Sequence, residues 1–147
     1  MIELLAAATL LLSPQPAQEA SPAGGWTWTL YADEAPVVLA HEVPDTAHLR
    51  ATLECEPGGN VAQLTLYGDG PDSGMARISA GEATAVAEAG PARGGGLRLA
   101  LRTDHPAFAA FSADGRLDIA LAGQRRTLEI PGAHLAKLRR FAELCSG

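Results

Sequence analysis

The sequence predicts a mainly β domain: a sandwich or half-barrel of about eight or nine short antiparallel strands, with a C-terminal α-helix packed on the sheet or plugging its open side. Short runs of alternating apolar and polar residues recur roughly every 8 to 12 residues. The 16 Gly and 10 Pro supply turns between these runs. One amphipathic run of helical period closes the chain. An α+β sheet with a helix on one face only is the alternative.

The first strand is predicted at residues 26–31, "WTWTLY", where Trp26, Trp28 and Leu30 alternate with polar residues. A turn at residues 56–60 predicts that the third and fourth strands form a hairpin. A second hairpin is predicted over residues 116–130, with its tip near residues 122–124. The other predicted strands are 36–43, 48–56, 61–68 and 97–103, with weaker signals at 75–79 and 82–89, and residues 90–96 are predicted to be a loop.

Two helices are predicted. In residues 104–115, "DHPAFAAFSADG", Asp104 is the expected N-cap, Pro106 lies in the first turn and Gly115 is the expected stop. The C-terminal helix spans 133–145, following Pro131 and Gly132. Its apolar face is predicted from spacings of three and four residues and comprises Leu135, Leu138, Ala142 and Cys145.

An apolar run at residues 4–12, "LLAAATLLL", predicts a signal peptide and processing region at residues 1–23. The run is too short to cross a bilayer, which needs about 20 apolar residues. The opening Met1 to Glu3 lacks Lys and Arg, so a short helix retained in the mature protein is the alternative. With a signal peptide, residues 24–147 form a single exported domain, periplasmic or secreted.

The chain has two cysteines, Cys55 and Cys145. In an exported protein such a pair predicts one disulfide. Cys55 lies on the apolar face of its strand and Cys145 on the apolar face of the C-terminal helix, so a helix packed on that sheet face brings the two sulfurs together. Two buried free thiols in a cytosolic protein are the alternative.

Charge is uneven along a chain of net charge −6: residues 1–90 hold 2 basic and 12 acidic residues, whereas residues 91–147 hold 9 basic and 5 acidic residues. Interleaving of the two halves in the fold is the simplest explanation. The alternative is a basic surface near the C-terminus that meets an anionic partner. Nucleic acid is not expected, because the net charge is negative and no stacking aromatics accompany the basic residues.

No motif predicts a metal or a cofactor. His41 and His48 lie seven residues apart with Pro44 between them, which is not the spacing of a zinc helix, although Glu42 and Asp45 are close. Asp69, Asp72 and Ser73 offer oxygen ligands for calcium without EF-hand spacing, and a polar turn accounts for them.

A catalytic triad is weakly indicated by Asp104 and His105 with a serine at position 73, 79 or 112. A Gly-x-Ser-x-Gly motif is absent, and neighbours in sequence rarely face each other as a triad requires. An enzyme is therefore expected only if polar residues meet in the fold, with His41, His105 or His134 beside a carboxylate or serine in a pocket.

Arginines near the C-terminus are the strongest candidates for anion or partner binding: Arg125, Arg126, Arg139 and Arg140, with Lys137 nearby. Their guanidinium groups suit phosphate or carboxylate. Arginine stems that cover apolar surface, with their heads in water, are the alternative.

The leader, the Trp-bearing first strand, the mid-chain cysteine, "AFAAFSADGRLDIAL" and the terminal "RFAELC" resemble small exported proteins of Gram-negative bacteria. Among these, the chain resembles the invasion-associated locus B family, mainly over residues 97–145. That resemblance implies a periplasmic β domain with a C-terminal segment packed on it. This family usually has more cysteines, and no functional residue is carried over.

These observations favour a non-enzymatic binding or envelope-interaction domain. Its expected partner is an envelope protein or an anionic envelope component. The alternatives are a hydrolase with a His/Asp site assembled in the fold, and a structural subunit of an envelope complex, which would expose an apolar patch of several hundred Å².

Overall fold

The computed structural model describes residues 24–147, and the predicted leader at residues 1–23 lies outside the described residues. The described chain consists of β1 (Thr27–Tyr31), β2 (Val37–Glu42), β3 (Leu49–Cys55), β4 (Val61–Leu66), β5 (Gly74–Ala80), β6 (Ala83–Pro91), β7 (Leu97–Arg102), α1 (Pro106–Asp114), β8 (Arg116–Leu121), β9 (Gln124–Glu129), the 3-10 helix η1 (Gly132–His134) and α2 (Leu135–Cys145).

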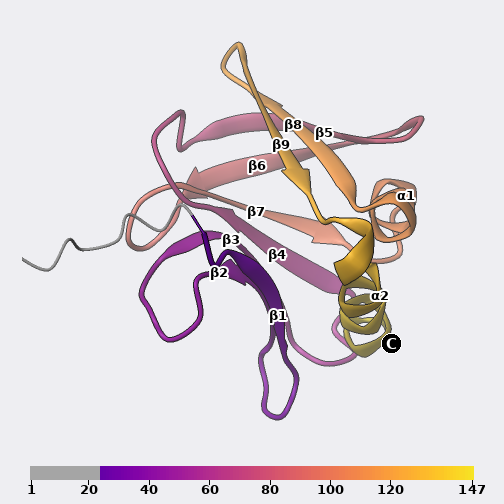
Figure 1. The fold of residues 1–147 in the computed structure, drawn as a ribbon. Coiled ribbons are helices and arrows are strands. Elements are labelled where there is room, and N and C mark those ends of the chain that lie inside the picture. Colours follow the sequence, from indigo (N-terminus) through magenta and orange to yellow (C-terminus); the bar gives the residue numbers. More distant parts are fainter. Residues whose placement is uncertain (1–23) are drawn as a thin grey trace, which may run out of the picture.

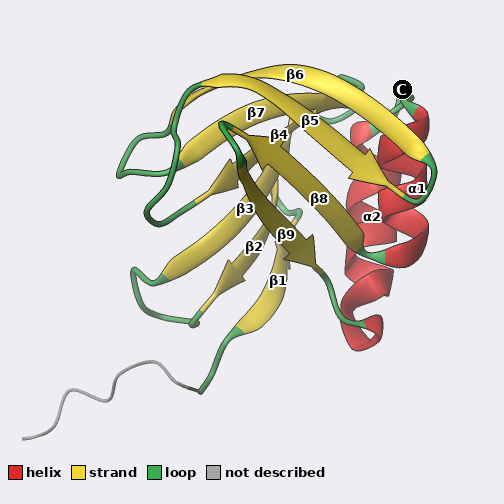
Figure 2. Cartoon of the chain, turned by 90° about the horizontal axis from the view of Figure 1, so that it is seen from above, coloured by secondary structure: helices red, strands yellow, loops and turns green. Residues whose placement is uncertain are grey.

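The nine strands form one antiparallel sheet in the order β1-β2-β3-β4-β7-β6-β5-β8-β9. The sheet curls into a half-barrel, and both helices lie at the same end of it (Figures 1 and 2). The predicted half-barrel with a C-terminal helix is confirmed, with nine strands. Both predicted hairpins form, as β3–β4 and β8–β9.

Apolar residues at alternate strand positions point into the half-barrel and meet the inner faces of α1 and α2. The largest fully buried side chains of this core are Trp28, Leu39, Leu64, Ile78, Leu97, Phe111, Leu117, Ile119, Ile130, Leu138 and Phe141. Two pairings join strands distant in sequence, β4 with β7 and β5 with β8. These pairings turn a chain of local hairpins into one curved sheet around a common core.

The weak strand signal at residues 82–89 corresponds to the longest strand, β6, which also takes in Gly90 and Pro91 from the predicted loop. Its alanines have low intrinsic β propensity. Pairing with β5 over seven residues and with β7 at its end holds the segment extended. Ala85 and Ala87 pack against the core. Tertiary contacts therefore outweigh the local preference.

Helix α1 begins one residue later than Asp104 predicts. His105 is the N-cap, and its Nδ1 accepts a hydrogen bond from the Ala107 N–H at 3.0 Å. Asp104 instead accepts two hydrogen bonds from Arg102, so the predicted Asp104 cap is wrong. The predicted stop at Gly115 is right: its φ is 76°, and a Cβ there would lie 2.4 Å from the Ile130 carbonyl oxygen.

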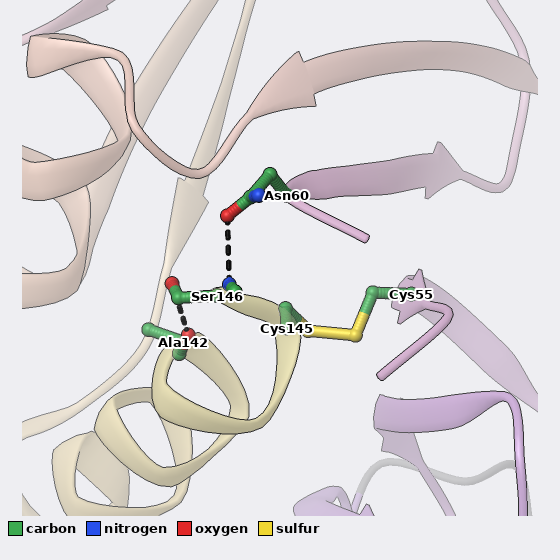
Figure 3. The surroundings of a disulfide bond; sticks show 6 residues. Cys55, Asn60, Ala142, Cys145 and Ser146 are labelled. Atoms are coloured by element: carbon green, nitrogen blue, oxygen red, sulfur yellow. Dashed lines mark hydrogen bonds between the residues drawn. A yellow bond between two sulfur atoms is a disulfide. The ribbon is translucent and has the colours of Figure 1, made fainter. Parts of the chain in front are cut away.

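The C-terminal tail is fastened to the β3–β4 turn by the disulfide between Cys55 and Cys145, whose Cα atoms are 5.7 Å apart (Figure 3). The predicted pairing is confirmed. Two hydrogen bonds accompany it: the Asn60 N–H donates to the Cys145 carbonyl at 2.8 Å, and the Gly147 N–H donates to the Asn60 side-chain Oδ1 at 2.9 Å. The covalent link is therefore part of a wider attachment of the tail.

Candidate functional site

The strongest candidate site is a cavity of about 420 Å³ between edge strand β9 and the ends of β2, β3 and β4. We call it the cationic cavity. Its lining residues are His41, Arg50, Ala51, Leu66, Tyr67, Arg126, Thr127, Leu128 and Glu129. Two guanidinium groups and one imidazole meet there, and Glu129 is the only acidic residue in this lining.

Strand alternation places two of these groups on the inner face of the sheet. His41 has the same parity in β2 as the buried Val37 and Leu39, and Arg126 has the same parity in β9 as the buried Leu128. In each strand, a buried apolar residue is thus the neighbour, on the inward face, of the polar residue at the cavity. Each side chain is half-buried.

Arg50 reaches the cavity because of an irregularity in the sheet. The register between β2 and β3 shifts at His41 and Glu42, so that Ala51 pairs with His41 and Leu49 pairs with Glu42, leaving Arg50 without an opposite residue. Such a bulge re-aims the extra residue. Simple alternation puts Arg50 on the polar face, which is why the sequence did not identify it.

Arg126 joins β9 to the far wall of the cavity. Its Nη2 donates to the Tyr67 carbonyl oxygen at 2.7 Å, and its Nη1 lies 3.5 Å from the Leu66 carbonyl oxygen. The Tyr67 N–H in turn donates to the Arg50 carbonyl at 3.0 Å. Tyr67 therefore links the Arg126 guanidinium to the backbone of Arg50.

Aromatic rings surround the other two groups. The Arg50 guanidinium carbon lies 4.0 Å from the centroid of the Trp26 ring, within the range of a cation–π interaction. The His41 imidazole stacks on Trp28 with ring centroids 4.7 Å apart and planes within 6°. These two tryptophans are the only ones in the chain, and both contact residues of this site, so tryptophan fluorescence can report on it.

The electrostatics of the site favour a neutral His41 and an uncompensated Arg126. Burial lowers the pKa of His41, and the positive charges of Arg50 and His134 lower it further. Burial also lowers the pKa of Arg126. Lys137 is close to this region, since its Nζ donates to the Trp28 carbonyl at 2.6 Å and lies 3.2 Å from His134 Nδ1.

Ion pairs do not neutralise the two arginines of the cavity. Across residues 24–147 the salt bridges are Arg102–Asp104, Arg116–Asp118 and Arg140–Glu143. All three join residues close in sequence within the basic C-terminal part. In the described chain, none of these salt bridges joins the acidic first part to the basic second part.

The four arginines singled out from the sequence are placed differently. Arg126 lines the cationic cavity, whereas its neighbour Arg125 is exposed and has the opposite parity on β9. Arg139 and Arg140 are exposed on α2, and Arg140 forms an ion pair with Glu143. The sequence pattern did not indicate Arg50 or His41 for this role. The sequence did contain one sign of the site: His41 and Arg126 are polar residues at strand positions that the alternation predicts to face inward.

The weaker candidates do not assemble into sites within residues 24–147. No three His, Cys, Asp or Glu side chains in that range lie together so as to hold a metal ion. His41 and Glu42 point to opposite faces of β2, and Glu42 accepts a hydrogen bond from Tyr31. Asp69, Asp72 and Ser73 are exposed in the loop before β5.

The histidines proposed for catalysis have other contacts. His105 caps α1, His134 contacts Lys137, and His41 stacks on Trp28. In the part of the chain that the structure describes, none of the hydrogen bonds joins a histidine ring to a carboxylate or a serine hydroxyl. The hydrogen bond from Arg102 is the main cause of the lowered pKa of the Asp104 carboxyl group. The positive charges of Arg102 and His105 lower this pKa further.

A second cavity of about 360 Å³ lies beside the disulfide, lined by Pro36, Glu54, Cys55, Glu56, Gly59, Val61, Gln63 and Arg98. Its one cation in this lining, Arg98, donates to Gln63 at 2.6 Å. Two glutamates face the same space. This cavity lacks the excess positive charge of the first.

An exposed apolar patch is the feature predicted for a structural subunit of an envelope complex. Tyr31, Met75 and Val86 are the large hydrophobic side chains that are exposed within residues 24–147, at 50%, 63% and 62%. Met75 and Val86 lie on the paired strands β5 and β6, opposite Glu88 and Arg77. Charged residues therefore interrupt the apolar surface there.

Comparisons with protein-family models, curated proteins and solved structures give no match to this chain. The resemblance to the invasion-associated locus B family stays a prediction. In residues 24–147 no helix has the length and apolar character needed to span a membrane.

Proposed function

We propose that the protein is an exported, non-enzymatic binding domain of the bacterial envelope, periplasmic or secreted, and that it binds an anionic group of an envelope partner in the cationic cavity. The convergence of Arg50 and Arg126 on one cavity, without a salt bridge to either in the described chain, carries this proposal. A carboxylate or phosphate supplies the missing negative charge and matches the geometry of guanidinium donors.

Charged groups held away from water favour binding because the protein has already met part of the desolvation cost. Arg126 is half-buried, and its two backbone contacts hold the guanidinium in place while other N–H groups of the same fork remain for a ligand. Such pre-organisation raises affinity by reducing the ordering that binding requires. His41 adds a neutral imidazole that can donate or accept a hydrogen bond.

Export is supported by the disulfide and by the predicted leader. A disulfide that joins β3 to the end of α2 is compatible with an oxidising compartment outside the cytoplasm. The experiment for this part is a mass measurement of the protein from its native source. A mature N-terminus near residue 24 and a mass two hydrogens below the reduced form are expected; an intact Met1 with two free thiols contradicts export.

Anion binding is tested by titrating the purified protein with sodium phosphate and with sodium succinate at constant ionic strength, followed by tryptophan fluorescence. We expect a saturable change with at least one of the two probes. Arg126→Gln or Arg50→Gln removes a charge-assisted contact of about 1.5 kcal/mol or more, so the affinity falls about tenfold or more.

Arg125→Gln is the matched control, because it makes the same charge change at the next position of the same strand but on the exposed side. It is expected to leave the affinity within about twofold, as a rim charge largely screened by solvent. Equal losses in the Arg125 and Arg126 variants, or no saturable response to either probe, contradict the proposal.

A further inference from the structure

Strand β9 lies at an edge of the sheet, with β8 as its neighbour in the strand order. The Ile130 N–H donates to the Gly115 carbonyl at 2.7 Å, and the register pairs Glu129 with Arg116. In an antiparallel ladder alternate residues turn their N–H and C=O groups toward the partner strand. Ile130, Leu128 and Arg126 therefore face β8, and Thr127 and Glu129 direct their backbone groups to the open side.

The cationic cavity runs along this open edge. Four consecutive residues of β9, from Arg126 to Glu129, line one wall, and Arg50, Ala51, Leu66 and Tyr67 line the wall opposite. Because consecutive residues of one strand line this wall, the cavity forms a groove parallel to the unpaired strand. Arg126 crosses the groove at one point, through its contacts with the carbonyls of Leu66 and Tyr67.

From this arrangement we infer that the anionic partner is an extended acidic peptide segment of another protein, which pairs with the open edge of β9 and places a carboxylate between Arg50 and Arg126. This inference rests on the proposed function. Backbone hydrogen bonds to Thr127 and Glu129 hold the peptide extended, as in other cases of strand addition. The two arginines select an acidic side chain or a C-terminal carboxylate.

Charge orders the peptide along the groove. Glu129 lies at the end of β9 farther from the hairpin tip and repels a carboxylate there, whereas Arg126 attracts one. The acidic residue of the peptide therefore lies opposite Arg126 and Thr127, and a neutral or basic residue lies opposite Glu129. Charged residues on an edge strand also discourage unwanted pairing, and the experiment separates these two roles.

The probe is a synthetic eight-residue peptide of alternating Thr and Val with one central Asp, studied by NMR with isotope-labelled protein. We expect the peptide to shift the amide signals of Thr127 and Glu129 and to slow their hydrogen exchange at least tenfold. Sodium phosphate is expected to perturb Arg50 and Arg126 without slowing those two amides. A peptide N-methylated on the groups that face β9 is expected to bind at least tenfold more weakly.

Thr127→Pro provides the matched variant, because it removes an N–H that points away from β8 and so spares the β8–β9 ladder. Thr127→Val is its control: it keeps the N–H and loses the hydrogen bond from Oγ1 to Asp118. We expect tenfold weaker peptide binding in Thr127→Pro than in Thr127→Val.

The results distinguish the two proposals. Peptide binding that depends on Arg126 but leaves the Thr127 and Glu129 amides unprotected, with the N-methylated peptide bound equally well, overturns the strand-addition inference and retains anion binding. Failure of peptide to bind while phosphate binds also overturns it. Failure of peptide, phosphate and succinate together overturns the proposed function as well.

Discussion

The two ends of the half-barrel are built from the same alternating strands but carry different side chains at their inward positions. At the end covered by α1 and α2, Phe108, Phe111, Leu138 and Phe141 are at most 2% exposed. The void between α1 and the sheet, which Phe108 and Phe111 help to line, measures only about 10 Å³. At the other end, His41, Arg50 and Arg126 line an open cavity of about 420 Å³.

This contrast indicates that the residues that stabilise the fold and the residues that could bind a ligand lie at different ends of the half-barrel. Close-packed apolar side chains account for the covered end, because burial of apolar surface and dense packing favour the folded state. A half-buried cation without a carboxylate partner, as Arg126 is, costs free energy and is not explained by stability alone. Positions that break the packing pattern are where a ligand site is expected.

The largest predicted effect tests the covered end. Replacing both cysteines, as Cys55→Ala with Cys145→Ala, opens a loop of about 90 residues and is expected to lower the free energy of unfolding by about 4 kcal/mol. Urea denaturation followed by circular dichroism measures this loss. Because the disulfide lies away from the cavity, the phosphate affinity of the folded variant is expected to stay within about twofold of the wild type.

Reduced wild-type protein is the control for the methyl-sized voids that the alanines leave. It is expected to lose a similar amount of stability. A loss below about 1 kcal/mol in both samples shows that the backbone hydrogen bonds and packing of α2 suffice to hold the tail. A parallel loss of phosphate affinity shows that the two ends of the half-barrel are coupled.

A smaller effect on stability is expected at the cavity. Arg126→Gln loses the contacts to the Leu66 and Tyr67 carbonyls that join β9 to the end of β4, and about 1 kcal/mol of unfolding free energy is expected to go with them. Arg125→Gln, exposed on the same strand, is expected to change it by less than about 0.5 kcal/mol. Urea denaturation of both variants measures this difference. Equal free energies of unfolding would show that the Arg126 contacts do not stabilise the sheet.

The smallest effect is a pH dependence that arises at His41. Its pKa is lowered in the folded protein by burial and by Arg50 and His134, so the unfolded chain takes up a proton at higher pH than the folded one. Stability is therefore fully present above the unfolded pKa of about 6.5 and falls as the pH drops through the folded pKa. Thermal midpoints between pH 8 and pH 5 measure the slope.

The comparison that isolates His41 is His41→Gln against His48→Gln. His48 is exposed in the turn before β3. The slope is expected to flatten in the first variant and to persist in the second. An unchanged slope in His41→Gln assigns the acid sensitivity to other groups.

Much of the fold could be predicted because its signals are local. Alternation in residues 26–31, 61–68 and 97–103 predicts the strands, and the helical spacing that ends at Cys145 predicts which way that cysteine points. Two cysteines on apolar faces were therefore enough to predict the bridge. The cap of α1 was missed because Asp104 and His105 are adjacent polar residues, and the Arg102 side chain draws Asp104 away from the helix.

Most of the site could not be predicted, because its residues come from four strands. Arg126 was chosen for its place in a basic run that also held Arg125, Arg139 and Arg140, and the structure separates these side chains. Arg50 depends on a bulge, which shifts a residue from one face of the sheet to the other and leaves no mark in the alternation.

The sequence by itself determined the strands, their hairpins, the terminal helix and the cysteine pair, since each follows from periodicity within a short stretch of chain. Only the tertiary structure decided that β7 lies beside β4 and β8 beside β5, and that Arg50 and Arg126 face one cavity. The physical reason is that alternation specifies which face of a strand is buried but not which distant strand lies next to it. That choice depends on how the whole sheet closes around a shared core.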